Sequence, residues 1–371
     1  MIKDGIEYIR GEPMRVVISA GGTGGHIYPA LAIVNKIKEK EPDSEFLYIG
    51  THNRMEKDII PNRGIPFKSI EIYGLNRKQP WKNVKTVSAL WKSYKQCKKW
   101  IREFNPDVVI GVGGYVTGPV IYAASKLGYP TFIHEQNSVA GKCNLFLSSK
   151  VSKIGISLPA SKNEFPKDKT IFTGNPCGED ARKAKPISKK SLGLQEHKKL
   201  VLIVMGSLGS SKVNEYLVHT MNLFRGKEYE VMFVTGKGDY EKIKKNSFPV
   251  NVHVVPYIDG LTGLMKQTDV MVSRAGASTL SEIIALQVPS SLIPSPYVTN
   301  NHQYKNAMDL IDRKAALLIE EKDLQGDILV RKIDLLMNEP KRCEEMKKGL
   351  ESLYIKDSAE KIYEILKEIT G

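Results

Sequence analysis

The sequence predicts an α/β protein built from two Rossmann-like domains, each with a parallel sheet covered by helices. Three observations lead to this prediction. Short apolar runs alternate with longer amphipathic stretches, as buried parallel strands and their crossover helices do. An apolar strand followed by a glycine turn and a helix opens both halves of the chain. The 371 residues suffice for two domains of common size.

The first half is expected to open with a strand over Arg15 to Ser19, a glycine turn over Gly21 to Gly25 and a helix from Pro29 through Lys40. A second glycine turn, Gly111 to Gly114, precedes a helix from about Pro119. The other strands predicted in this half cover Phe46 to Ile49, Asp107 to Ile110 and Thr131 to His134.

The second half is expected to repeat this plan after a linker that lies between Gly155 and Lys185. A third glycine turn, Gly206 to Gly209, follows its first strand. The apolar spacing over Asp357 to Ile369 predicts a final amphipathic helix. The strands predicted here cover Leu200 to Met205, Val231 to Val234, Val252 to Val255 and Asp269 to Val272.

The composition is that of a basic globular protein. Apolar residues make up 41% and charged residues 26%, values that exclude a disordered chain, collagen or a coiled coil as the main architecture. Lys and Arg outnumber Asp and Glu by 55 to 41, giving a net charge of +14. This excess favours an acidic partner, which is a phosphorylated substrate, a membrane surface or a nucleic acid.

Cysteine usage and hydropathy indicate a reducing, cytoplasmic setting. The four cysteines lie far apart, without metal-ligand spacing, so neither a disulfide framework nor a zinc site is expected. No apolar run of ~20 residues is long enough to span a bilayer. Any membrane contact is therefore expected to be peripheral.

The three glycine turns follow strands and precede helices, where backbone N–H groups and the helix dipole favour a phosphate. The first is not a Walker A loop, because no GK[ST] follows, and Ile27 replaces the third glycine of the dinucleotide fingerprint. Each turn alone could be a tight strand-to-helix connection. Together, at strand carboxyl ends, they favour a phosphate-bearing ligand between two domains.

A fourth candidate ligand segment runs from Ser273 to Glu282 and is expected to start a helix. Its small residues would let a ligand approach the helix N-terminus. The Glu282 carboxylate could accept two hydrogen bonds from a ribose diol, although a solvated helix residue is the alternative. No D-x-D pair is present to hold a metal–diphosphate, so backbone amides, helix dipoles and cations such as Arg274 would meet the leaving-group charge.

The polar run His134 to Asn137 follows an apolar strand and is either a cleft edge or a hydrogen-bonded loop. His26 is a possible general base, because its pKa lies near neutrality, or a helix-capping histidine.

The segment Ile72 to Arg102 carries nine basic residues, no acidic residue and all three tryptophans. Basic side chains beside exposed aromatic ones suit an anionic membrane surface. The alternative is an ordinary surface helix whose apolar side packs on the domain core, and Trp91 is expected to lie in that core.

Several ordered motifs together resemble a known family, the bacterial lipid I N-acetylglucosaminyltransferases of glycosyltransferase family 28. The resemblance runs from about residue 15 to the C-terminus. The motifs that carry it are GGTGGHIYPA at 21–30, GVGGYVTGP at 111–119, HEQN at 134–137, GNP at 174–176, the segment 273–282 and HQY at 302–304.

The resemblance implies a GT-B fold, in which two Rossmann-like domains face each other across a cleft. The first domain would span residues 1–172 and be completed by a C-terminal helix over 355–371, and the second would span 173–354. The implied reaction transfers GlcNAc from UDP-GlcNAc to the C4 hydroxyl of MurNAc-pentapeptide on undecaprenyl diphosphate (lipid I), with inversion, to give lipid II. The resemblance implies no cofactor and no metal.

The implied setting is the cytoplasmic face of the cell membrane, where the protein would be peripheral on an anionic membrane surface. Cell-wall synthesis and division proteins are possible partners, and no nucleic acid is expected.

The resemblance also assigns site residues. Those assigned to the acceptor diphosphate are Gly22, Gly113, Gly114 and Tyr115. Those assigned to UDP-GlcNAc are Thr23, Gly24, Gly25, Asn137, Ser207 at the diphosphate, Ile258 at the uracil, the nucleotide-covering residues Ala277, Ser278, Thr279, Leu280 and Ser281, Glu282 at the ribose, and Gln303 at the sugar. Arg274 is added to the UDP-GlcNAc residues as the cation expected near the leaving group.

His26 is the predicted catalytic base, with Glu135 as the rival. Two positions depart from the family pattern. Gly178 stands where the family usually has Arg, with Arg182 the nearest cation, and Met205 stands where the family usually has Gly.

Two other functions are considered. A different GT-B enzyme, such as a glycolipid transferase or a UDP-GlcNAc 2-epimerase, would share the nucleotide half, but the acceptor-half motifs favour lipid I. A non-enzymatic nucleic-acid-binding protein is suggested by the charge alone, and no nucleic-acid-binding module is recognised.

Overall fold

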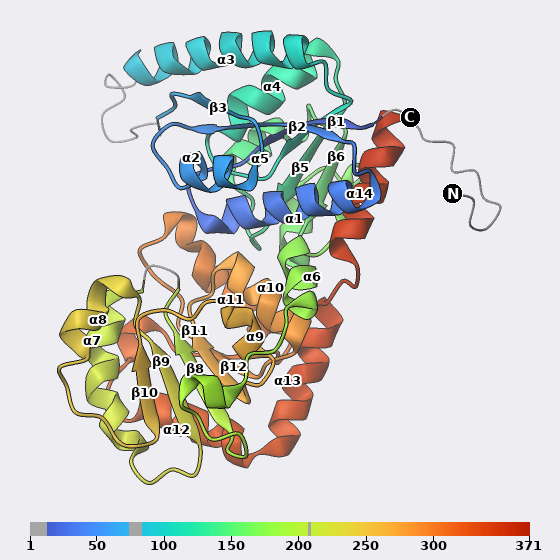
Figure 1. Cartoon of the computed structure of the whole chain (residues 1–371). Coiled ribbons are helices and arrows are strands. Elements are labelled where there is room, and N and C mark those ends of the chain that lie inside the picture. Colours follow the sequence, from blue (N-terminus) through green and yellow to red (C-terminus); the bar gives the residue numbers. More distant parts are fainter. Residues whose placement is uncertain (1–12, 74–83, 207–208) are drawn as a thin grey trace, which may run out of the picture.

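The computed structural model describes residues 13–73, 84–206 and 209–371. These residues form two lobes, each an α/β layer structure around its own parallel sheet (Figure 1). The predicted fold class, two parallel-sheet domains, is confirmed.

The first sheet has seven strands in the order β3-β2-β1-β4-β5-β6-β7, all of them parallel to their neighbours. Its strands are β1 (Arg15–Ser19), β2 (Glu45–Thr51), β3 (Phe67–Ile70), β4 (Val108–Gly111), β5 (Thr131–Glu135), β6 (Lys153–Ile156) and β7 (Thr170–Phe172). Helices in this half of the chain are α1 (Gly24–Lys40), α2 (Glu56–Ile59), α3 (Val84–Phe104), α4 (Thr117–Leu127), α5 (Lys142–Ser148) and α6 (Pro176–Lys183).

The second sheet has six parallel strands in the order β10-β9-β8-β11-β12-β13. They are β8 (Leu200–Val204), β9 (Glu230–Val234), β10 (Val252–Val255), β11 (Val270–Ser273), β12 (Ser290–Leu292) and β13 (Leu317–Leu318). The remaining helices are α7 (Ser211–Thr220), α8 (Lys237–Ile243), α9 (Leu261–Met265), α10 (Ala277–Leu286), α11 (His302–Ile311), α12 (Ile328–Asn338), α13 (Pro340–Leu353) and α14 (Ser358–Thr370).

Both sheets place their first strand at the point where the strand order reverses. β1 lies between β2 and β4, and β8 lies between β9 and β11. In open parallel sheets, ligands bind beyond the carboxyl ends of the strands at this point. The glycine turns that follow β1, β4 and β8 are therefore placed where a ligand would be expected.

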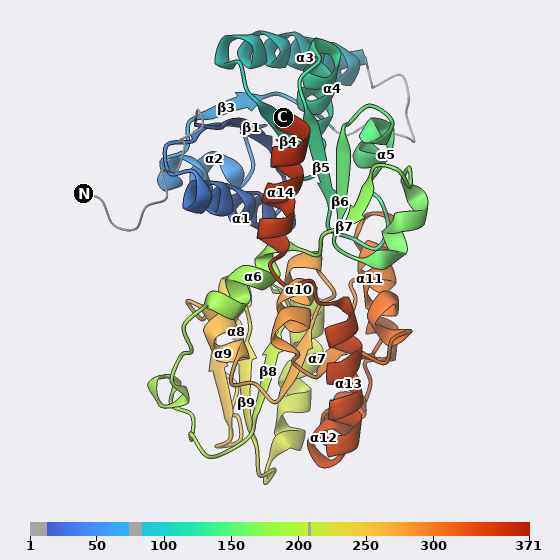
Figure 2. The same ribbon diagram turned by 90° about the vertical axis from the view of Figure 1, so that its right-hand side faces the viewer.

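The chain passes between the domains twice, once before α6 and once between α13 and α14. Helix α14 packs against α1, and Ile362, Ile365 and Leu366 are buried in the core of the first domain. Figure 2 shows α14 lying along the upper lobe, while α12 and α13 lie on the lower one. The domain boundaries at 172 and 354 stay a prediction, with β7 ending at Phe172 and α13 at Leu353.

The range predicted to hold the linker, Gly155 to Lys185, contains the first passage between the domains, at residues 173–175, together with ordered elements. β6 and β7 pair within the first sheet, and α6 packs on α1 and α10. β7 has only three residues, which is too short for an apolar pattern to be recognised in sequence.

The predicted start of the first helix at Pro29 is wrong, because α1 begins at Gly24. The backbone of Gly24 and Gly25 continues the helix that was expected to follow them. Proline is tolerated near the start of a helix, and here it lies in the second turn.

Trp91 was expected in the core and is instead 59% exposed. The apolar face of α3 is buried only in its second half, where Cys97 and Ile101 are inaccessible to solvent, while Val87 and Leu90 remain exposed. Trp81 lies outside the described residues. Within the described ranges, no helix is both long and apolar enough to cross a bilayer.

Candidate functional site

The first two glycine turns touch each other beyond neighbouring strands β1 and β4. The Gly21 N–H donates to the Gly113 carbonyl oxygen at 3.2 Å. A Cβ atom on Gly114 would lie 2.5 Å from the Gly21 oxygen, and Gly114 has a φ of +90°. A side chain at Gly114 would therefore clash and strain the backbone, so this contact requires glycine.

The second turn presents unpaired backbone amides. The N–H groups of Gly113, Gly114 and Tyr115 donate to no group in the described part of the chain, and they lie just before α4. Successive amides of this kind next to a helix N-terminus bind anions. The predicted contacts of these three residues with the acceptor diphosphate stay a prediction, and the geometry is suited to it.

Gly22 differs from the other residues assigned to the acceptor, because its N–H donates to Glu56 Oε2 at 3.2 Å. Glu56 is fully buried and also accepts from the Thr51 N–H at 3.0 Å and the Thr51 hydroxyl at 2.6 Å. Glu56 thus holds the first glycine turn in place. Its role was missed in the sequence, which shows only an acidic residue in a polar stretch.

His26, in the first turn of α1, is fixed by the two glycine turns. Its Nδ1–H donates to the Gly21 oxygen at 3.0 Å, and a Cβ on Gly113 would lie 2.5 Å from the ring carbon Cδ2. Because a carbonyl can only accept, the neutral ring carries its lone pair on Nε2, where no hydrogen bond is found among the described residues. Burial lowers the pKa of His26, which keeps the ring neutral.

Glu135, the rival base, already accepts four hydrogen bonds. They come from the Asn137 N–H and side-chain amide, each at 3.1 Å, the Gly141 N–H at 2.8 Å and the Asn144 side chain at 2.9 Å. A carboxylate saturated in this way orders its own loop. Of the two alternatives for the segment His134 to Asn137, a hydrogen-bonded loop describes Glu135 well.

The rest of this segment joins the two domains. His134 donates from Nε2 to the Gly174 oxygen at 3.0 Å, at the first passage between domains, and burial lowers its pKa to about 4. The amide oxygen of Asn137 accepts from Asn306 of α11 at 3.1 Å. The loop is thus both hydrogen-bonded and at the edge of the cleft.

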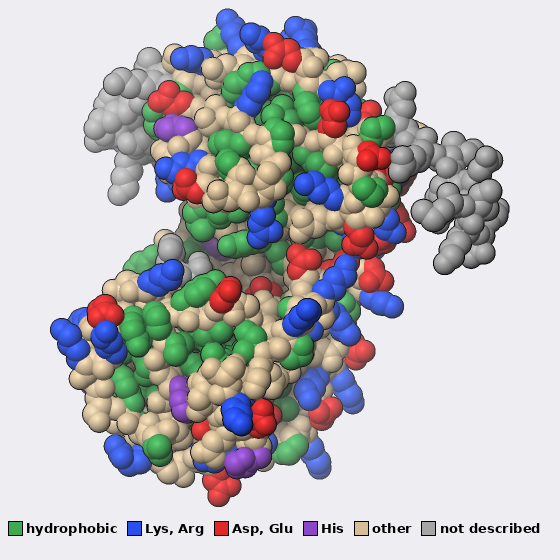
Figure 3. Space-filling view, in the orientation of Figure 1, with side chains coloured by type: hydrophobic (Ala, Val, Ile, Leu, Met, Phe, Trp, Pro, Cys, Tyr) green, Lys and Arg blue, Asp and Glu red, His purple; other side chains and the backbone are tan. Residues whose placement is uncertain are grey.

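The N-termini of α1 and α10 face each other across the gap between the lobes (Figure 1). A Cβ on Gly25 would lie 3.9 Å from Ser278 Oγ, so the two helix starts are close. Figure 3 shows the surface hollowed between the lobes. The predicted donor residues Thr23, Gly24 and Gly25 of the first domain are therefore brought to Ala277, Ser278 and Thr279 of the second.

Glu282 lies in the second turn of α10 and is only partly exposed. Its carboxylate has no hydrogen bond or ion pair within residues 13–73, 84–206 and 209–371, and burial raises its pKa to about 7. The alternative of a freely solvated helix residue is therefore not supported. An unpaired acceptor in a protected position suits a ribose diol.

The other residues assigned to the donor differ in their surroundings. Ile258 is buried in the core of the second domain, and Leu280 and Ser281 are buried in α10. The Gln303 oxygen accepts from the Ser295 N–H at 2.8 Å, which leaves the amide nitrogen of Gln303 for a ligand. Ser207 lies outside the described residues.

The guanidinium of Arg274 already has partners within the protein, so it is not free to bind a ligand. Its guanidinium donates to Glu321 Oε2 at 2.8 Å, the Ser210 hydroxyl at 2.7 Å and the Ile293 oxygen at 3.0 Å, and the residue is 7% exposed. In this arrangement it fixes the end of the third glycine turn at Ser210.

Gly178 and Arg182 lie on the face of α6 that packs on α10. A Cβ on Gly178 would lie 3.1 Å from both the Ser281 oxygen and the Ala285 Cβ, so a larger residue would push the helices apart. Arg182 donates to the Ala285 oxygen at 3.3 Å and lies over the Tyr354 ring. Arg182 is therefore placed at the end of α10, away from the helix N-terminus where a diphosphate would bind.

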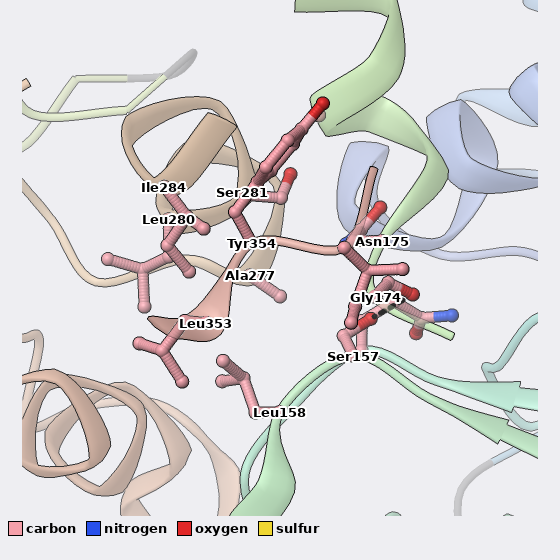
Figure 4. Close-up of a pocket in the computed structure, with 13 residues that line it drawn as sticks. Ser157, Leu158, Gly174, Asn175, Ala277, Leu280, Ser281, Ile284, Leu353 and Tyr354 are labelled. Atoms are coloured by element: carbon pink, nitrogen blue, oxygen red, sulfur yellow. Dashed lines mark hydrogen bonds between the residues drawn. The ribbon is translucent and has the colours of Figure 1, made fainter. Parts of the chain in front are cut away.

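A small, open pocket lies between the two passages of the chain. Figure 4 shows Leu353 and Tyr354 on one side of it, with Gly174 and Asn175 on another. Of the predicted site residues, Ala277, Leu280 and Ser281 line it, from the side of α10 that faces the interdomain connections. No group of three or more His, Cys, Asp or Glu side chains in the described ranges is placed to hold a metal ion.

An aromatic strip, defined as Trp91, Tyr94, Tyr122 and Phe146, crosses the outer surface of α3, α4 and α5. Neighbouring rings along it are 5.5, 5.6 and 5.8 Å apart. Trp91 and Phe146 are more than half exposed. Lysines lie over three of the rings, namely Lys95 over Trp91, Lys126 over Tyr122 and Lys150 over Phe146.

Comparison with known proteins agrees with this geometry. The chain matches the glycosyltransferase family 28 N-terminal domain over residues 16–156 and the family's C-terminal domain over 200–366. A "UDP-N-acetylglucosamine--N-acetylmuramyl-(pentapeptide) pyrophosphoryl-undecaprenol N-acetylglucosamine transferase" of Bacillus licheniformis is 48% identical over 96% of this chain and 99% of its own. A protein of the same name from Bacillus cereus, numbered 1, is 47% identical over the same shares.

Solved structures share the fold. MurG of Acinetobacter baumannii aligns with a TM-score of 0.75 at 25% identity, covering 96% of this chain and all of its own. A UDP-GlcNAc 2-epimerase from Neisseria meningitidis aligns with a TM-score of 0.64 at 18% identity, covering 96% of this chain and all of its own, which shows likeness of fold alone. The two family domains and the near full-length relatives favour the transferase over the epimerase. The chain belongs to glycosyltransferase family 28, among the MurG-type N-acetylglucosaminyltransferases.

Proposed function

We propose that this enzyme transfers GlcNAc from UDP-GlcNAc to the C4 hydroxyl of the MurNAc-pentapeptide of lipid I, with inversion, to give lipid II. The names of the Bacillus relatives support these substrates. The structural observation that carries the proposal is that the start of α10 lies next to the start of α1, while the glycine turn before α1 contacts the amide-rich turn before α4. Donor and acceptor each carry a diphosphate, and each needs such a region.

The donor would lie over the start of α10. The N-terminal amides of this helix would face its diphosphate, and Glu282 would accept hydrogen bonds from the ribose. Ile258 would lie beside the uracil, and the free amide nitrogen of Gln303 would reach the sugar. Arg274 would act indirectly, by holding Ser210 at the end of the third glycine turn.

His26 would be the base of a single displacement. Its Nε2 would take the proton of the C4 hydroxyl as that oxygen attacks C1 of GlcNAc, and the bond from C1 to the UDP oxygen would break on the opposite face. The charge that develops on UDP would be met by the α10 amides and the helix dipole. Because these groups come from the chain itself and no D-x-D pair is present, we expect no divalent metal to be required.

Release of UDP tests the reaction directly. With UDP-GlcNAc and a lipid I analogue, we expect UDP release that depends on the acceptor and continues in excess EDTA. Release without acceptor would indicate a hydrolase, and conversion of UDP-GlcNAc to an epimer without release would indicate an epimerase. Loss of activity on chelation would disprove the metal-independent part of the proposal.

Replacing the proposed base gives a second prediction. His26→Ala should lower kcat by at least about a hundredfold, because the acceptor proton has no recipient. In the unmodified enzyme, kcat should fall at acidic pH, where the ring becomes protonated. Steady-state rates across pH check both expectations, with His52→Ala as the surface control.

Glu135→Gln should behave differently from His26→Ala. An amide nitrogen in place of a carboxylate oxygen would face N–H donors, so the loop to Gly141 should loosen and the thermal midpoint fall. A near-normal rate for His26→Ala, together with a folded but inactive Glu135→Gln variant, would transfer the role of base to Glu135.

Glu282→Gln gives a third prediction, with opposite effects on binding and stability. The pKa of about 7 means that the folded protein holds this proton more tightly than the unfolded chain does. The stability contributed by the group is present at acidic pH and lost as pH rises from the ordinary carboxyl range to about 7. Glu282→Gln should therefore raise the free energy of unfolding by about 1–3 kcal/mol at pH 8 and by much less at pH 5.

The same variant should bind the donor at least about tenfold more weakly, because the amide offers fewer acceptor sites to the ribose. In the unmodified enzyme, the KM for UDP-GlcNAc should rise as pH falls below 7. Denaturant titrations and initial rates at both pH values check these outcomes, with the exposed Glu364→Gln as control. A pH-independent KM with unchanged stability would remove Glu282 from the site.

We also propose that the aromatic strip rests on the anionic cytoplasmic surface of the cell membrane. Exposed rings with lysines over them combine apolar and electrostatic attraction to such a surface. Tyr122 lies on α4, about 8 Å along the helix from its first residue, Thr117, and the amides up to Tyr115 lie just before that residue. A lipid-linked diphosphate at the membrane surface would thus lie within reach of its binding amides.

Vesicle sedimentation provides the fourth prediction. Trp91→Ala combined with Phe146→Ala should lower binding to vesicles containing phosphatidylglycerol by about tenfold or more, because two exposed apolar side chains are lost. Val250→Ser, at an exposed apolar position of the second domain, should bind as before. Turnover of a water-soluble acceptor should be unchanged in both. Unchanged vesicle binding of the double variant would disprove this orientation.

A further inference from the structure

Asn306 of α11 lies fully buried at the junction of the two domains. Its side-chain oxygen accepts from the Ser138 N–H at 2.8 Å and from the Ser138 hydroxyl at 2.9 Å. Its side-chain nitrogen donates to Asn137 Oδ1 at 3.1 Å and to the Ala275 carbonyl oxygen at 3.2 Å. Both acceptor and both donor positions of this amide are thus used, and three of the four bonds cross between domains.

The partners of Asn306 come from the two halves of the proposed site. Asn137 and Ser138 belong to the loop after β5, which Glu135 orders in the first domain. Ala275 belongs to the turn after β11, two residues before α10 begins. One side chain therefore ties the acceptor-domain loop to the turn that positions the helix N-terminus facing the donor diphosphate.

The amide is satisfied in this way only when the domains are in the arrangement described. A buried polar group without a partner is costly, and hydrogen bonds are sensitive to displacements of a fraction of an ångström. The four bonds therefore favour this relative placement over neighbouring ones in which the lobes are rotated or further apart. When the lobes separate, water can take over each bond, so the contact can open and re-form.

We propose that Asn306 is a positioning residue that latches the two domains in the closed arrangement in which the donor site is complete. The proposal rests on the proposed function, because it assigns the latch to UDP-GlcNAc binding. Asn306 acts through Asn137 and the start of α10 and takes no part in the chemical step. Without it, the donor would have to close the lobes at the expense of its own binding energy.

Hydrogen–deuterium exchange tests this contact directly, because the Ser138 N–H donates one of the hydrogen bonds to Asn306. In Asn306→Ala, the peptide covering residues 136–141 should exchange about tenfold faster or more than in the unmodified protein, and UDP should restore less protection. The KM for UDP-GlcNAc should rise about tenfold. Lys305→Ala, an exposed neighbour on the same helix, should leave both quantities unchanged.

Two further variants guard against a trivial loss of folding. Ser138→Ala leaves α11 intact and removes one of the four bonds, so it should raise KM by a smaller factor, and its effect should be non-additive with that of Asn306→Ala. Asn306→Asp keeps the acceptor for Ser138 but places a carboxylate against the Ala275 oxygen, so it should not restore a normal KM.

A purely structural role would lower kcat or the thermal midpoint with KM and exchange at 136–141 unchanged, and this result would overturn the proposal. Additive effects of Ser138→Ala and Asn306→Ala would overturn it as well. If the unmodified protein exchanged as expected but did not turn over UDP-GlcNAc, the proposed function would fail and the exchange result would still decide whether the latch exists.

Discussion

The proposed site depends on one constraint, which is that backbone N–H groups would have to face the diphosphates of the ligands. Amides can do this only where two chain segments approach closely and where a helix leaves its first N–H groups without partners. The contact between Gly21 and Gly114 meets the first condition, since neither position tolerates a Cβ atom. The parallel sheets meet the second, since β1, β4 and β11 each lead through a short turn into a helix, α1, α4 and α10.

The ionisable groups around the cleft fall into two classes with different uses. Glu56, Glu135 and Arg274 are buried and fully engaged, and each fixes a loop that presents amides. His26 and Glu282 instead keep a free acceptor position, and burial shifts the pKa of each toward its neutral form. Groups that are partly desolvated and unpaired are the ones expected to interact with substrate, whereas the engaged groups supply rigidity.

Sequence patterns were sufficient for the elements whose signal is local. The strand Arg15–Ser19 was predicted with its observed bounds, and the repeated order of strand, glycine turn and helix led to the correct fold class. The start of α1 was wrong, because glycine signals a turn in sequence even where the backbone is helical. Trp91 was misplaced, because periodicity shows which face of a helix is apolar but not how much of its length is covered.

In the candidate site, too, the residues with a local sequence signal could be predicted, and those that act through distant partners could not. Its glycine turns and the segment Ser273 to Glu282 could be recognised because the spacing of residues along the chain carries the signal. Glu56 and Asn306 could not, since each acts through partners far away in sequence, such as Gly22 for Glu56 and Ser138 for Asn306. Arg274 was recognised as a cation near the site, but only the fold reveals that Glu321 already neutralises it.

The return of α14 to the first lobe has a consequence for biosynthesis. Ile362 and Leu366 complete a core that otherwise consists of residues made much earlier, while the second lobe contains all of its own strands between residues 200 and 318. Domains generally fold as units while the chain emerges from the ribosome. In this protein the lobe synthesised first is therefore completed only after the strands of the second lobe have been made, because α14 follows all of them in the chain.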